Sequence, residues 1–219
     1  MKKRTFGREA SLGIILIFCI ASTGFINPRF VTGDGTRDLL SATAIVALLA
    51  IGMAPVMIMR HIDLSIASTV GFSAWLVADF CAKNPSFTWW QCFVIGGAVG
   101  IAVGVINGLL VAGLRLPSLV VTLGTLYIVR GGVYVVSNSV DYNAQEMPPS
   151  LLSLGQKTFA GLLPFPFLMV IILMVIVAWY MKYTKAGRDC YAIGSNPPAA
   201  DLVGLKVFRR TFLAYIFCG

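Results

Sequence analysis

Charged residues are scarce in this sequence, making up 12% of its 219 residues, whereas an ordinary soluble domain carries roughly 25%. Hydrophobic residues make up 58%, and the mean hydropathy is +0.84. A soluble core of this size cannot hide so much apolar surface, so the lipid bilayer is expected to be its solvent. The composition therefore excludes a soluble globular domain and, because of its long apolar runs, a disordered chain.

Signatures of enzyme chemistry are also missing. The sequence has no G-x-x-x-x-G-K-[ST] phosphate loop, so it does not hydrolyse ATP by that route. It has neither G-x-S-x-G nor H-E-x-x-H. His61 is its only histidine, and no Cys, His or carboxylate cluster has metal-ligand spacing. We therefore expect no enzyme activity, no metal and no other cofactor.

The five cysteines show no paired C-x-x-C spacing, and most lie in apolar runs, where cysteine behaves as a small buried hydrophobe. Cys81 and Cys92 flank one short loop, and the sequence leaves open whether they pair. The net charge of +8 does not indicate a nucleic-acid partner, because the basic residues sit beside apolar runs.

What the sequence does contain is a series of apolar runs. Six of them are expected to cross the bilayer as helices, and a seventh stops after a few residues, well short of the roughly 20 needed to span. They cover residues 12–26, 39–59, 64–81, 88–114, 119–136, 159–181 and, for the partial run, 211–219. The expected fold is an all-α, polytopic integral membrane protein with six complete transmembrane helices and the start of a seventh, residues 1–219 forming one transmembrane domain that is truncated inside a helix.

The distribution of Lys and Arg predicts the orientation. With the N-terminus in the cytoplasm, twelve basic residues fall inside and four outside, while Arg130 falls within a span. The inside set is Lys2, Lys3, Arg4, Arg8, Arg60, Arg115, Lys182, Lys185, Arg188, Lys206, Arg209 and Arg210, and the outside set is Arg29, Arg37, Lys83 and Lys157. This bias predicts that residues 182–210 are cytoplasmic and that the polar loops 27–38 and 137–157 are outside.

Glycine recurs every four residues in the fourth run, at Gly96, Gly100, Gly104 and Gly108. Such a row exposes backbone along one helix face, so that another helix can approach closely. We expect its role to be helix packing.

Polar residues inside apolar runs are candidates for function. Arg130 should face protein or water, and Asp79 is its expected ion-pair partner. Asn107, Thr122 and Thr125 either line a hydrophilic translocation path with Arg130 or bond between helices; the sequence does not decide. Before the third run, Asp63 and Ser65 are expected to cap the helix start on the cytoplasmic side.

The longest polar segment, residues 182–210, looks built to be held by another protein. Asn196 is a suitable helix cap, Pro197 suits a first turn, and Gly204 accepts the left-handed conformation just after a helix. This predicts a helix over residues 197–203, with Ala199, Leu202 and Val203 on one face. A helix of two turns is not stable alone, so we expect it to lie in a groove of a partner.

Three stretches resemble the membrane permease subunits of bacterial ABC importers for monosaccharides. They are HIDLSIAS at 61–68, NGLLVAGLRLPSLVVTLGT at 107–125 followed by Arg130-Gly131, and GRDCYAIGSNPPAADLVG at 187–204. His61 and Ala67 replace two glycines of the first family motif. Members of this family have about ten spans, so this chain is shorter than they are.

The resemblance implies that segment 182–210 is the loop that couples transport to a separate ATPase. The residues that match this loop are Gly187, Arg188, Gly194, Asn196, Pro197, Ala199, Ala200, Leu202 and Gly204. It further implies an inner-membrane permease for a sugar of the autoinducer 2, rhamnose or ribose type, working with an ATP-binding cassette subunit, a periplasmic sugar-binding protein and a second permease subunit. The alternative is a proton-coupled secondary transporter that uses Asp63, His61 or Arg130.

Overall fold

The computed structural model describes residues 6–84, 86–138, 140–143 and 146–219, without the side chains of residues 6, 8 and 9. The predicted basic N-terminal residues Lys2, Lys3 and Arg4 lie outside this part, as does Pro85. Its helices are α1 (Phe6–Ile26), α2 (Gly33–Ile58), α3 (Ile66–Lys83), α4 (Trp89–Gly108), α5 (Ser118–Ser137), α6 (Pro149–Gln156), α7 (Phe165–Tyr183), α8 (Lys185–Ser195), α9 (Pro197–Leu202) and α10 (Val207–Cys218). The elements η1 (Pro28–Val31) and η2 (Leu109–Gly113) are a 3₁₀ turn and a π-helical turn.

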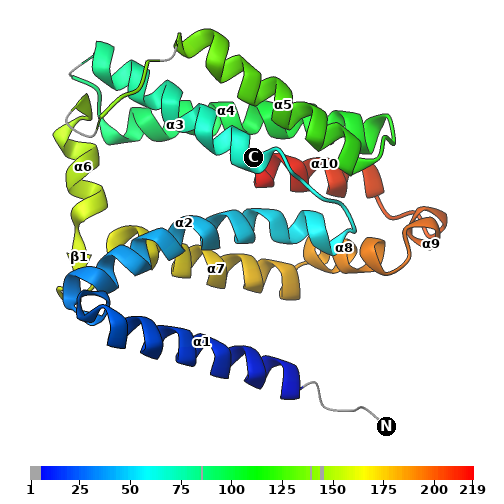
Figure 1. The fold of residues 1–219 in the computed structure, drawn as a ribbon. Helices are drawn as coiled ribbons and strands as arrows, with labels where there is room; N and C mark the ends of the chain where they lie inside the picture. Colours follow the sequence, from blue (N-terminus) through cyan, green and yellow to red (C-terminus); the bar gives the residue numbers. More distant parts are fainter. Residues whose placement is uncertain (1–5, 85, 139, 144–145) are drawn as a thin grey trace.

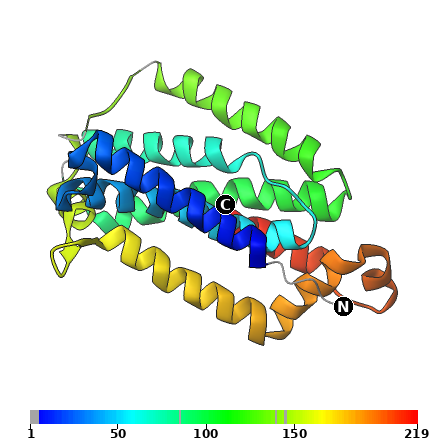
Figure 2. The ribbon, with the colours of Figure 1, turned by 60° about the horizontal axis from the view of Figure 1, so that its bottom comes forward.

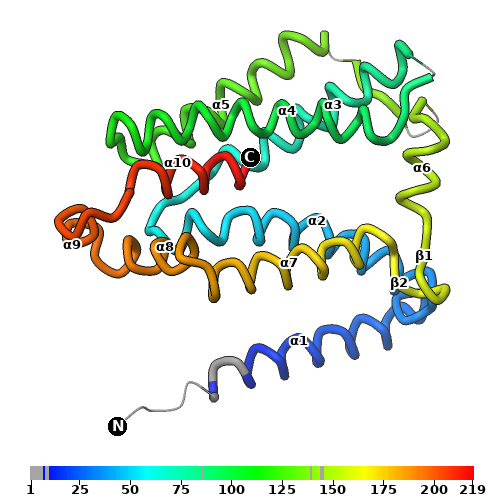
Figure 3. Tube along the Cα trace, turned by 180° about the vertical axis from the view of Figure 1, so that it is seen from behind, coloured from blue at the N-terminus to red at the C-terminus, as the bar shows by residue number. Residues whose placement is uncertain are grey.

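The helices form two groups that run roughly along one direction (Figure 1). Helices α3, α4 and α5 make one group, α2 and α7 with the outlying α1 make the other, and α10 lies between them. At one end, α6 and the two-stranded hairpin of β1 (Thr158–Phe159) and β2 (Leu163–Pro164) connect the groups. Helices α8 and α9 lie at the opposite end, as the view from behind also shows (Figure 3).

The predicted all-α, membrane-spanning class is confirmed. The predicted number of spans is not. Among the described residues, four helical stretches are long and apolar enough to cross a membrane: Gly33–Ile58, Trp89–Gly113, Ser118–Ser137 and Phe165–Tyr183. Exposed side chains of these stretches include large apolar ones, such as Ile128 and Val135 of Ser118–Ser137, each more than 70% exposed, which suits a lipid environment. Six spans and the start of a seventh remain a prediction.

Several predicted boundaries need correction. Helix α2 begins at Gly33 inside the predicted loop, because the Thr32 hydroxyl accepts a hydrogen bond from the Gly35 amide and caps it. The segment expected as an outer loop contains α6, and the predicted start of the sixth run forms the β1–β2 hairpin. The hairpin is held to α2 by Arg37, whose Nε donates to the Gly161 carbonyl at 3.1 Å.

The glycine row of α4 lies largely against α10. A Cβ at Gly100, Gly104 or Gly108 would collide with Gly219, with the Tyr215 backbone or with Phe212, whereas one at Gly96 would only touch a Val77 side chain. Three of the four glycines therefore allow α10 to approach to backbone contact, and Gly96 faces α3. The segment of residues 211–219 forms the larger part of an ordered helix with a buried face.

Candidate functional site

The polar segment of residues 182–210 contains two short helices, α8 and α9, where a single one over residues 197–203 was predicted. Helix α8 was missed; Thr184 caps it by accepting from the Gly187 amide at 3.0 Å. Helix α9 confirms the predicted cap, because Asn196 Oδ1 accepts from the Ala199 amide at 3.2 Å. Gly204 follows with the predicted left-handed backbone, at φ +75°.

The C-terminal end of helix α9 exposes the apolar side chains of Leu202 and of the following residue, Val203, whereas Ala200 is buried. Leu202 is 88% and Val203 74% exposed, whereas Ala200 is 3% exposed. Large apolar side chains on such a short, exposed helix leave apolar surface uncovered in this chain alone. The surface of Leu202 and Val203 is called the α9 tip below.

The α8–α9 pair is fixed firmly to the rest of the molecule. Arg210 of α10 donates from Nε and Nη2 to Asp189 Oδ2 at 2.9 and 2.7 Å, and both side chains are largely buried. Arg60 Nη2 donates to the Ser195 carbonyl at the end of α8 at 2.9 Å. A displacement of α8 would therefore be transmitted to α10 and to the connection between α2 and α3.

Two glycines of the predicted coupling loop allow this attachment. A Cβ at Gly194 would collide with the Ile58 carbonyl at the end of α2, and one at Gly187 with the Met181 backbone of α7. The remaining loop residue, Arg188, donates to the Tyr183 carbonyl at 2.9 Å. These residues hold α8 against the helices that precede it.

A buried polar network joins the start of α3 to α4 and α5. Asp63 Oδ1 accepts from the Ser65 amide and hydroxyl at 2.9 and 2.6 Å, Asn107 Nδ2 donates to Ser65 Oγ at 2.8 Å, and Thr125 Oγ1 donates to Asn107 Oδ1 at 2.7 Å. Thr122 reaches back to the Ile62 carbonyl at 3.4 Å. The expected cap by Ser65 is wrong in detail, since its hydroxyl serves this network and makes no cap bond.

The buried network bears on the alternatives for Asn107, Thr122 and Thr125. Asn107 and Thr122 have no exposed surface and Thr125 is 7% exposed. In this structure the three side chains form hydrogen bonds between different segments of the chain. That they line a translocation path stays a prediction.

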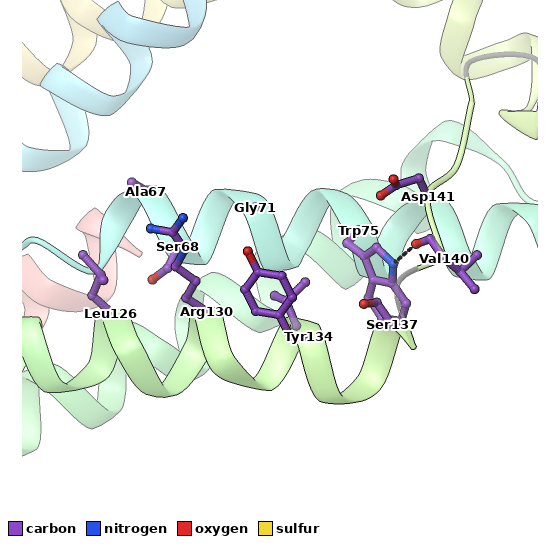
Figure 4. A pocket seen from close by; sticks show the side chains of 11 residues that line it. Ala67, Ser68, Gly71, Trp75, Leu126, Arg130, Tyr134, Ser137, Val140 and Asp141 are labelled. Carbon is purple, nitrogen blue, oxygen red and sulfur yellow. Dashed lines mark hydrogen bonds between the residues drawn. The ribbon is translucent and has the colours of Figure 1, made fainter.

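Arg130 has a different setting. It lines a pocket of about 450 Å³ between α3 and α5, with Ala67, Ser68, Gly71, Trp75, Leu126, Val133, Tyr134, Ser137, Val140 and Asp141 (Figure 4). The predicted Arg130–Asp79 ion pair is wrong: Asp79 pairs with Lys83 at 2.7 Å and accepts from the Tyr142 hydroxyl at 2.6 Å. Within the described residues, no carboxylate comes within ion-pair distance of Arg130.

Two contacts of Trp75 lie at the end of this pocket that contains Val140 and Asp141 (Figure 4). The Trp75 indole N–H donates to the Val140 carbonyl at 3.1 Å, and the Tyr142 ring lies against Trp75. The Asp79 carboxylate that accepts from the Tyr142 hydroxyl also raises the pKa of that hydroxyl, which favours its protonated, donating form. Residues that follow α5 are thereby held on α3.

Two buried cysteines, one near the end of α3 and one near the start of α4, face one another. Cys81 Sγ and Cys92 Sγ are 3.5 Å apart and are not bonded. The structure thus brings the two free thiols into contact.

Comparison with known proteins agrees with this class of membrane protein. The family described as "Branched-chain amino acid transport system / permease component" matches residues 35–219. The chain is 34% identical over all 219 residues to an autoinducer 2 import system permease protein LsrC of Enterobacter sp. (strain 638), and equally to one of Klebsiella pneumoniae. It is 30% identical over 210 residues, 94% of the chain, to the L-arabinose ABC transporter permease protein AraH of Azospirillum brasilense.

The helical, apolar fold and this match define a multi-pass permease component of the bacterial inner membrane. The chain belongs to the branched-chain amino acid transport system permease family. It spans 62% of the length of the LsrC relatives and 60% of AraH. No solved structure matches it significantly.

Proposed function

We propose that this chain is part of the permease subunit of an ABC importer that moves a monosaccharide or sugar-like signal, of the autoinducer 2, rhamnose or ribose type, across the inner membrane. Its partners would be an ATP-binding cassette subunit, a periplasmic sugar-binding protein and a second permease subunit, identical or related. The names of its relatives, an autoinducer 2 permease and an arabinose permease, support a sugar-like cargo. The permease itself would do no covalent chemistry.

The orientation of this permease would place α8 and α9 in the cytoplasm. The basic residues Arg60, Arg115 and Arg188 lie on or beside these helices, at the end of the molecule where α1 also begins (Figure 2). This arrangement fits the positive-inside bias and supports a cytoplasmic N-terminus. The α6 segment and the hairpin would then face the periplasmic binding protein.

The α9 tip is the observation that carries the proposed coupling. It offers Leu202 and Val203 to a partner while Ala200 anchors the helix to the body of the protein. Because Asp189, Arg210 and Arg60 connect α8 to α10 and α2, a partner that moved α9 would shift the spans between outward- and inward-facing states. ATP-driven closure of the ATPase dimer would supply that movement.

A polar substitution of the α9 tip tests the coupling. Leu202→Asp should leave membrane insertion unchanged, because the side chain is exposed, but should abolish co-purification of the ATPase subunit and substrate-stimulated ATP hydrolysis in proteoliposomes. Leu162→Asp, an exposed leucine at the opposite end, is the control for ATPase binding and should co-purify with the ATPase subunit as the wild type does. Normal ATPase binding and stimulation in the Leu202 variant would rule out this docking surface.

The geometry does not favour proton-coupled transport as the alternative function. His61 lines a cavity beside α9, whereas Arg130 lines the pocket between α3 and α5. Asp63 is buried and engaged by Ser65. These groups are therefore spread over separate environments rather than arranged as one relay.

A further inference from the structure

Arg130 lies on α5, one of the stretches able to cross a membrane, and presents an unpaired guanidinium to the pocket between α3 and α5. A charge at such depth is costly unless it meets water, a counter-charge or a ligand. Arg130 precedes Ser137, the last residue of α5, by about 10 Å along the helix axis. No carboxylate of the described chain neutralises it, and its five N–H donors are fixed in a planar fork. The pocket therefore contains a strong, directional donor set that no described group uses.

The pocket walls supply what a sugar would require besides donors. Trp75 and Tyr134 lie between Arg130 and the outer end, where Asp141 offers a carboxylate (Figure 4). Aromatic faces cover the apolar C–H surface of a pyranose or furanose ring, while the charged groups hydrogen-bond its hydroxyls. A volume of about 450 Å³ falls within the range of about 300–1,000 Å³ typical of small-molecule sites.

The charges also discriminate between classes of ligand. An anion would be attracted by Arg130 but repelled by Asp141, and a cation would meet the reverse. A wholly apolar ligand would strip water from both charged groups without replacing its hydrogen bonds, which is costly. A neutral molecule with several hydroxyl groups satisfies the donor at one end and the acceptor at the other. A zwitterion would match both charges too, and the cargoes named for the relatives favour the sugar.

We propose that the pocket between α3 and α5, lined by Arg130, Tyr134, Trp75 and Asp141, is a transit site for a neutral, polyhydroxylated sugar that enters from the outer face. The sugar would sit with its ring against Trp75 and Tyr134 and with hydroxyl oxygens accepting from Arg130. The Trp75 indole, which donates to the Val140 carbonyl, and the pocket-lining residues Val140 and Asp141 form the wall at their end of the pocket. This inference rests on the proposed function for the direction of entry and for the sugar cargo.

Cysteine protection can test the site without measuring transport. Gly71 lines the pocket, and a Cβ there would meet nothing within 4 Å, so Gly71→Cys places a thiol in the pocket without a clash. Gly131→Cys is the matched control, because it is next to Arg130, is equally free of neighbours and is not part of the pocket lining. Both are made with Cys19→Ser, since Cys19 is exposed and the other four native cysteines are buried. Burial also raises the pKa of Cys190 and so lowers its thiolate fraction.

The measurement uses the full-length permease in sealed proteoliposomes and a membrane-impermeant thiosulfonate, with L-arabinose and D-ribose as probes. Polyethylene glycol dimethyl ether, which is neutral and has no hydroxyl groups, is the osmotic control. At about ten times its Kd, a sugar that occupies the site should slow modification of Gly71→Cys about tenfold, because the free fraction falls by 1 + [L]/Kd. The Gly131→Cys rate should not change. Adding Arg130→Gln should abolish the protection and Arg130→Lys should weaken it, since lysine lacks the fork.

Two results would overturn the proposal. One is a Gly71→Cys thiol that the reagent modifies equally fast with and without either sugar. The other is protection that persists in Arg130→Gln. The test needs no ATPase, so loss of protection with intact ATPase coupling would reject the pocket alone, whereas protection without ATPase coupling would reject the proposed importer alone.

Discussion

Asn107 is the residue through which three helices share one hydrogen-bond network. Its amide donates to Ser65 at the start of α3 and accepts from Thr125 of α5, while it stands on α4. Buried polar groups of this kind stabilise only when each is satisfied, and a missing partner leaves the full desolvation cost. The network therefore fixes the relative positions of α3, α4 and α5, which also form the walls and support of the Arg130 pocket.

Thr125→Val should destabilise the protein, because it removes the donor to Asn107 Oδ1 and leaves that oxygen buried. We expect a loss of about 1–3 kcal/mol, seen as a melting temperature lower by several degrees in detergent. Thr43→Val is the matched control: both hydroxyls bond to the carbonyl four residues earlier, but Thr43 is exposed and has no further partner. Equal melting temperatures for the two variants would contradict the role given to the network.

His61 should make stability depend on pH. Burial lowers its pKa below the usual value, so the unfolded chain binds more protons than the folded one as the pH falls through the unfolded pKa of about 6.5. The native state should therefore be most stable above that pH and lose stability below it. His61→Gln should lose less stability than wild type between pH 7.5 and 5.5 in thermal unfolding; parallel curves for the two proteins would contradict this account.

At the scale of elements, the contact of α4 with α10 decides how the two helix groups are joined. The glycine spacing predicted close packing along one face, and the local sequence around Asn196 and Gly204 predicted α9 to within a residue. The sequence did not predict which helix would approach the glycines, because that partner lies about a hundred residues away and spacing carries no information about it. Helix α8 was missed because its polar, glycine-containing sequence resembles a loop until the contacts of Gly187 and Gly194 are seen.

Gly104→Ala should damage this packing, because its Cβ would collide with the Tyr215 backbone. Overpacking of this kind costs typically about 1–3 kcal/mol, and we expect a lower melting temperature and poorer yield of monodisperse protein. Gly97→Ala on the same helix has open space around its Cβ and should be neutral or slightly stabilising. A Gly104→Ala protein as stable as the Gly97→Ala protein would show that α10 does not pack here.

At the scale of the whole molecule, the sequence predicted the membrane class, because composition acts over the entire chain, whereas the docking of residues 182–210 on a partner stays a prediction. It could not predict which polar groups meet. Asp79 was the plausible partner of Arg130 by depth alone, but Lys83 and Tyr142 lie closer to it, and this leaves Arg130 facing the pocket. The same limit applies to Asn107 and Thr125, whose partners become evident only when α4 and α5 are side by side.

The central claim is that α9 is held by a separate ATPase and transmits its movement to the spans. It is tested most directly by site-specific crosslinking in membranes that contain the full-length permease and its ATPase subunit. The permease carries Leu202→Cys, and the ATPase carries single cysteines placed along its surface. Leu162→Cys in the permease is the control. The account predicts a crosslink from Leu202→Cys whose efficiency changes between the nucleotide-free and ATP-bound states, and none from Leu162→Cys. Absence of any Leu202→Cys crosslink in every nucleotide state would contradict it.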